Sequence, residues 1–296
     1  VREIFATFPD EAGRFPTRKL VMTGNPIRRA LLELTEGRRD TMCALSGRGV
    51  VEASVGERAG AHWATVAQRL VNEGVVLHEL STVSEESLSD CRVLIVAGPT
   101  AALSADEALA VSAFLETGRG LYLGLRSRNE AGTGTQPRTG LELLLEERGL
   151  AALPGMVVDP SQETELAPAW LSYEGYADHP ISESFEGRVA TVWDRARALR
   201  VQGDDASCIM RASDAGWNEL QTHQSWGKGV HERGDADGDE RCVAAASSAT
   251  GRVAVVGSAL SMSSLWFDRG ASGNERFLLS TLLWLLDRHV EVELLD

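Results

Sequence analysis

Blocks of apolar residues alternate with amphipathic segments through the first half of the chain, and one stretch predicts a strand, a helix and a strand. Residues 92–97 are apolar and β-branched, as in a strand covered on both faces. Ser104 and Glu107 have the spacing of a capping box, so we expect a helix to begin there. Gly118 is suited to end that helix, and residues 121–125 predict the next strand.

The same alternation occurs earlier in the chain. Helices are expected over residues 25–37 and along the apolar face of residues 63–70, ended by Gly74. Strands are expected at 41–45 and 75–80. Strands that alternate with amphipathic helices predict an α/β fold, with a mostly parallel sheet and helices on both faces.

The second half has a different pattern of secondary-structure elements. Between residues 154 and 249 the elements are short and glycine is frequent, which favours an irregular lobe of antiparallel strands. Segments 241–248 and 252–257 predict a hairpin, and 274–288 a closing helix. The expected organisation is an extended lead-in (1–20) and a single α/β domain (21–296), made of a parallel half (21–150), an antiparallel lobe (151–250) and a closing strand and helix (251–290).

Composition limits the classes of partner that the chain can bind, and the spacing of the cysteines predicts whether they form disulfides. A net charge of −14 over 296 residues argues against nucleic acid and against direct adhesion to anionic lipid. The longest apolar run, 278–286, is about half of the roughly 18 residues that a membrane span requires. The first residue is Val1, so we expect a soluble piece of a longer protein. The cysteines are far apart with no Cys-x-x-Cys motif, which predicts four free structural thiols: Cys43, Cys91, Cys208 and Cys242.

Candidate binding residues lie where strands of the parallel sheet end, because ligands favour that edge of an open α/β sheet. Glycines in these loops allow backbone N–H groups to approach a ligand, and the Arg48 guanidinium could bind a carboxylate or phosphate with two hydrogen bonds. The alternative is that glycine only turns the chain out of each strand. The candidates are Ser46, Gly47, Arg48, Gly49, Gly98, Pro99, Thr100 and Ser258.

Other site chemistries find little support in the sequence. The strand at 121–125 is not followed by a nucleophile elbow, and Ser46 and Ser258 are better explained as turn or cap hydroxyls, so no catalytic residue is expected. Nucleotide fingerprints and paired metal ligands are missing, which predicts neither cofactor nor metal. Trp217 and Trp226 could contact a partner subunit or a glycan, although core packing explains tryptophans equally well.

Several segments, in order, resemble the auxiliary, substrate-binding-like subunits of gliding-motility-type ABC transporters. These segments are 25–49, 93–125, 176–182, 217–219, 252–262 and 277–288. The resemblance implies a domain type shared with an intraflagellar transport protein and related to class I glutamine amidotransferases. The expected fold is therefore a flavodoxin-like or amidotransferase-like sheet. This chain has Arg48-Gly49-Val50 where the family usually has the sequence His-Gly-Glu. This difference weakens the case that the loop has the family's ligand-binding role.

The resemblance also implies a function. It predicts a non-catalytic, extracytoplasmic (periplasmic) domain of an ABC-type transport or gliding-motility complex, with a permease or sister auxiliary subunit as partner, or a small-molecule or glycan ligand. Association with the membrane would come from flanking helices or from these partners. The alternatives are an amidotransferase-like or hydrolase enzyme and a purely architectural heterodimerisation module.

Overall fold

The computed structural model describes most of the chain from residue 40 to residue 288. The described residues are 40–53, 61–126, 137–161, 169–172, 174–183, 185, 189–220, 240–267 and 272–288, together with two N-terminal strands. These strands, β1 (Ile4–Thr7) and β2 (Thr17–Leu20), pair antiparallel within the predicted lead-in. The predicted helix at 25–37 lies outside the described residues, as does Trp226.

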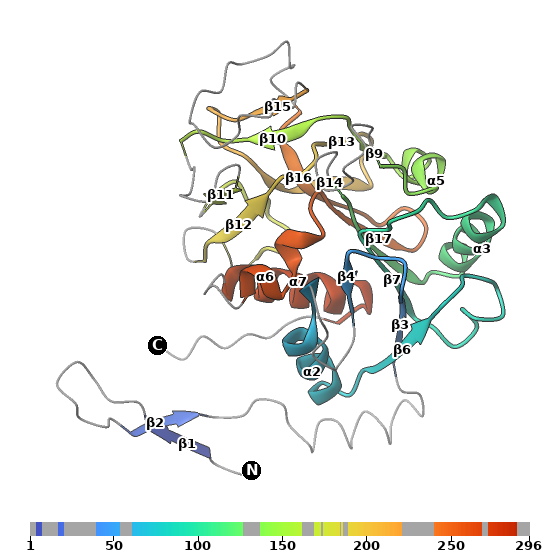
Figure 1. Ribbon diagram of the computed structural model, residues 1–296, viewed down its shortest axis with the longest axis horizontal. Coiled ribbons are helices and arrows are strands. Elements are labelled where there is room, and N and C mark those ends of the chain that lie inside the picture. Colours follow the sequence, from blue (N-terminus) through green and yellow to red (C-terminus); the bar gives the residue numbers. More distant parts are fainter. Residues whose placement is uncertain are drawn as a thin grey trace.

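A mixed α/β fold surrounds a curled, mostly parallel central sheet (Figure 1). The parallel strands are adjacent in the order β6 (Val76–Leu80), β3 (Thr41–Leu45), β7 (Val93–Ala97), β8 (Gly120–Gly124) and β17 (Arg252–Val256). Each was predicted from its apolar run to within a residue or two. β3, β7 and β8 are buried throughout, whereas β6, at the end of the sheet, is partly exposed.

Helices cover both faces of the sheet, because successive strand residues point to opposite sides. On one face lie α2 (Ala64–Asn72) and α7 (Ser272–Leu285), and on the other lie α3 (Ala105–Glu116) and α5 (Glu142–Glu146). In β8, Tyr122 joins the first cluster, and its two neighbours in sequence join the second. None of the helices in the described ranges has the length and apolar content needed to cross a bilayer.

The capping box predicted for α3 is present. Glu107 N–H donates to the Ser104 hydroxyl at 3.2 Å, and Ser104 N–H donates to the Glu107 carboxylate at 2.8 Å. Gly118 follows the helix with φ +80°, a conformation that glycine adopts without strain. The local signals at both ends of α3 therefore predicted its bounds.

The strands of the second half before β17 pair antiparallel, as predicted. β16 (Cys242–Ser247) forms the expected hairpin with β17 and also pairs with β14 (Ala206–Arg211) and β13 (Leu199–Val201), which continues to β9 (Leu150–Ala152). Shorter pairs are antiparallel β10 (Met156–Val158) with β15 (Trp217–Glu219), antiparallel β11 (Ala169–Ser172) with β12 (Thr191–Asp194), and parallel β4 (Val51–Glu52) with β5 (Ala61–His62). The short helical segments η1 (Leu260–Met262) and α6 (Ser264–Phe267) follow β17.

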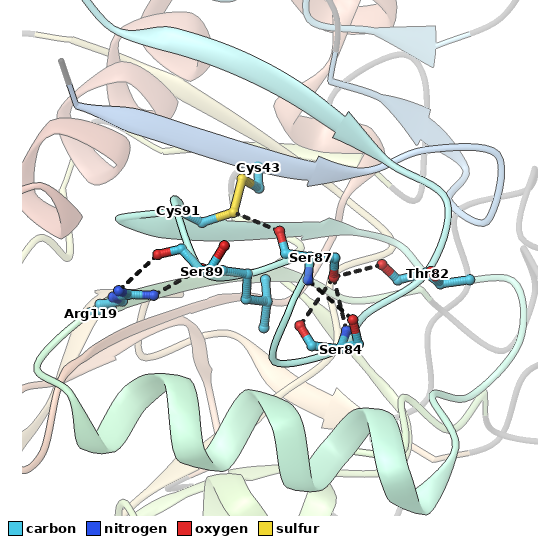
Figure 2. The surroundings of a disulfide bond; sticks show 8 residues. Cys43, Thr82, Ser84, Ser87, Ser89, Cys91 and Arg119 are labelled. Carbon is cyan, nitrogen blue, oxygen red and sulfur yellow. Dashed lines mark hydrogen bonds between the residues drawn. A yellow bond between two sulfur atoms is a disulfide. The ribbon is translucent and has the colours of Figure 1, made fainter.

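The prediction of four free thiols was wrong, because the cysteines form two disulfides. Cys43 on β3 is bonded to Cys91, just before the neighbouring strand β7, and Cys208 on β14 is bonded to Cys242 on β16. Figure 2 shows the first bond, with Ser87 O at 3.4 Å from Cys91 Sγ. Each pair belongs to neighbouring strands, an arrangement that spacing along the sequence does not reveal.

Candidate functional site

Two of the predicted strand-end loops are hydrogen-bonded to each other. Val50 N–H donates to Gly98 O at 2.9 Å, and Thr100 N–H donates to Arg48 O at 2.7 Å. The Thr100 hydroxyl donates to the same oxygen at 3.0 Å, and Gly49 and Pro99 form an antiparallel bridge. The loops after β3 and β7 therefore act as one unit at the carboxyl edge of the sheet.

Close backbone approach explains two of the glycines in these loops. A Cβ atom on Gly49 would lie 2.5 Å from Ala97 O, closer than packed atoms can approach. Gly98 has φ +69°, and a Cβ there would lie 2.4 Å from Val50 Cγ2 and 2.9 Å from Ala259 Cβ. Ala259 follows β17, so the loop after that strand packs against the loop after β7. These contacts favour the interpretation that glycine serves the packing of the loops.

Arg48 is bound by a carboxylate of the chain itself. Its guanidinium forms a bidentate ion pair with Glu107, in the first turn of α3, with one Nη2–Oε2 distance of 3.2 Å. Hydrogen bonding from Arg48 lowers the pKa of Glu107 from 4.5 to about 2. The arginine that the sequence suggested for a ligand carboxylate therefore connects the loop after β3 to the start of a helix.

The two candidate serines also have partners within the chain. The Ser46 hydroxyl is within hydrogen-bond distance of Glu52 Oε2 at 3.1 Å and of Glu79 Oε2 at 3.2 Å. Gly47 N–H donates to the other oxygen of Glu52 at 3.2 Å. Ser258 is buried, and its hydroxyl accepts from Ser261 N–H at 3.1 Å at the start of the 3-10 turn. Both serines thus stabilise turns.

His179, a histidine with an adjacent acid in the sequence, lies in a packed environment at α7. Its ring is edge-on to Trp284 with centroids 5.1 Å apart, and its Nδ1 accepts from Ile181 N–H at 3.2 Å. Burial, together with the positive charge of Arg252, lowers the pKa of His179 from 6.5 to about 4. The ring is therefore neutral at physiological pH and holds the loop that contains it.

The tryptophan proposed as a partner contact is also internal. Trp217 is 5% exposed, and its Nε1–H donates to the Glu219 carboxylate at 3.1 Å. Within the described ranges, no group of three or more His, Cys, Asp or Glu side chains could hold a metal ion. The acidic residues at this edge, Glu52, Glu79 and Glu107, were not identified from the sequence as parts of the site. The sequence predicted Glu107 only as part of the capping box that begins a helix.

Comparison with known proteins establishes a likeness of fold. No family model matches the chain, and no curated protein matches it. Among solved structures, the mmIFT52 N-terminal domain is similar, with a TM-score of 0.62, 17% identity, and coverage of 86% of this chain and 100% of that one. The exo-beta-1,4-mannosidase Op5Man5 from Opitutaceae bacterium strain TAV5 has a TM-score of 0.39 at 12% identity, over 84% of this chain and 36% of the mannosidase, too low to support an argument. The chain is therefore similar in fold to the mmIFT52 N-terminal domain.

Proposed function

We propose that this chain is a non-catalytic binding domain on the extracytoplasmic, periplasmic face of a membrane, in an ABC-type transport or gliding-motility complex. It acts by contacting a permease or a sister auxiliary subunit. The main support for this proposal is that the polar groups at the carboxyl edge of the parallel sheet bind other parts of the same chain.

That edge is where an open α/β sheet ordinarily binds its ligand. Here the Arg48 guanidinium is bound by Glu107, and the Thr100 N–H and hydroxyl bind Arg48 O. Ser46 contacts carboxylates, and the Ser258 hydroxyl accepts a backbone N–H. A hydrolase or amidotransferase would need a nucleophile beside a general base, so these contacts support a binding role through the outer surface.

The disulfides support the extracytoplasmic part of the proposal. Disulfides persist in oxidising compartments such as the periplasm and are rare in the cytosol. Three of the bonded cysteines, Cys43, Cys91 and Cys242, are at most 2% exposed. Buried bonds of this kind are suited to a structural role.

We also infer a flavodoxin-like arrangement for the parallel half. The strand order β6-β3-β7-β8-β17 supports it, because it places the first strand of the set between the second and the third. The same strand order supports our description of the sheet as class I glutamine-amidotransferase-like.

The test is to express the parent chain with an affinity tag, extract the membranes with detergent and identify the proteins that co-purify. Recovery of a transporter permease or a sister auxiliary subunit is the expected result. The control is the affinity tag alone, expressed, extracted and purified in the same way.

Turnover assays on small amides and esters complete the test. No turnover is expected, and Ser46→Ala and Ser258→Ala should retain partner binding. A parent chain that purifies alone, or covalent labelling of either serine by a fluorophosphonate probe, would contradict the proposal.

A further inference from the structure

We propose that the outer face of helices α3 and α5 is the docking surface for a partner helix with apolar side chains flanked by lysine or arginine. The inference rests on the proposed function, which requires a partner subunit, and identifies the surface that the subunit contacts. We call this surface the α3–α5 face and define it by Ala105, Leu109, Ala113 and Leu143, with the acidic residues beside them.

Helix α3 has apolar residues on its outer side as well as on its inner side. Its inner side buries Val111, Phe114 and Leu115 against the sheet. Its outer side exposes Ala105, Leu109 and Ala113, which are four residues apart and so lie on one side of the helix. The exposed side of a surface helix ordinarily carries polar residues. The outer side of α3 is therefore suited to contact another protein.

A second exposed leucine lies on the neighbouring helix. Leu143 on α5 is 76% exposed and Leu109 is 68% exposed, the highest values for large apolar side chains in the described part of the chain. The two helices are joined near both ends. Leu103 N–H donates to Thr139 O at 2.8 Å, and the Arg148 guanidinium pairs with Glu116 of α3 at 3.2 Å. Both helices cover the same side of the sheet (Figure 1).

The charge of the α3–α5 face favours a basic partner helix over a second copy of this chain. Exposed carboxylates border the leucines at Asp106, Glu116, Glu146 and Glu147. Arg148 pairs with Glu116 and Glu147 but is itself buried, and neither Asp106 nor Glu146 forms an ion pair with any residue that the structure describes. A second copy of this face would bring carboxylates together, which is unfavourable. A helix with lysine or arginine beside its apolar residues complements both features.

The first experiment uses two synthetic amphipathic peptides and the folded chain. One peptide has leucines on one face flanked by lysines, and the other has glutamates in place of the lysines. Isothermal titration calorimetry should detect binding of the lysine peptide. Leu109→Ser and Leu143→Ser should each weaken that binding about tenfold, because each removes a large part of the apolar contact. Leu265→Ser, at a leucine 42% exposed on α6, is the matched control and should leave binding unchanged.

Equal binding of the two peptides, or unchanged binding in both leucine variants, would overturn the assignment. So would a wild-type dimer in sedimentation that Leu109→Ser converts to monomer, because the occupant would then be a second copy.

The second experiment repeats the detergent co-purification with Leu109→Ser and Leu143→Ser combined. Loss of the permease or sister subunit supports the α3–α5 face. If the subunit is retained, this surface is wrong and the proposed function stands, whereas a wild-type chain that recovers no subunit contradicts the proposed function itself.

Discussion

Removing the Cys43–Cys91 disulfide should destabilise the domain severely. The bond closes a loop with a sequence separation of 48, which contains α2 and the edge strand β6. In the chain-entropy description, a loop of that length stabilises the folded state by about 4 kcal/mol. A domain is typically stable by about 5–15 kcal/mol, so this one bond is a large part of the total. Alanine is the preferred replacement for both cysteines because a serine would bury a hydroxyl in the β3–β7 region.

The assay is thermal unfolding followed by circular dichroism. Cys43→Ala with Cys91→Ala should lower Tm by about 10 °C. The matched control is Cys208→Ala with Cys242→Ala, whose loop separation of 34 predicts a nearly equal loss, also about 4 kcal/mol. Reductant should lower the Tm of the wild type but not that of the variant that lacks all four cysteines. Four free thiols in the denatured, unreduced wild type, or an unchanged Tm, would refute the reasoning.

Three further predictions concern single side chains. Tyr122→Phe should raise the free energy of unfolding in urea by about 1 kcal/mol, since the buried hydroxyl has no hydrogen-bond partner among the described residues; a loss of stability would reveal a partner. Glu107→Gln should cost about 1 kcal/mol at neutral pH, allowing for solvent screening. Because the pKa of Glu107 is lowered from 4.5 to about 2 by folding, its contribution is present above pH 4.5 and is lost as the pH falls toward 2, so the variant should lose less stability than the wild type over that range. The pKa of His179 is lowered from 6.5 to about 4, so the unfolded chain binds its proton first and stability falls as the pH drops through that window; His179→Asn should flatten the profile there, and an unchanged slope would contradict the assignment.

Local signals in the sequence predicted the elements of the parallel half. The apolar runs of β3, β7 and β8 and the capping box of α3 depend on residues within a few positions of each other, and the structure has each of them. The hairpin of β16 and β17 was predictable for the same reason, since two apolar strands are separated by a short turn.

Contacts between distant segments could not be predicted in this way. Arg48 and Glu107 are 59 positions apart, and they meet because β3 and β7 are neighbours and α3 begins just beyond β7. The disulfide from Cys43 to Cys91 depends on the same strand order. The sequence indicated that Arg48 could bind a carboxylate or phosphate of a ligand, but not that a carboxylate of the chain itself would bind it.

Gly49 offers a way to recognise related chains. Any larger residue at this position would force Ala97 O away and separate the loops after β3 and β7. Arg48 beside it can vary, because its side chain leaves the loop and pairs with α3. A distant relative that keeps the glycine but replaces the arginine can therefore retain the joined loops, whereas one that replaces the glycine must build this edge differently. Searches for relatives should give the glycine more weight than the arginine.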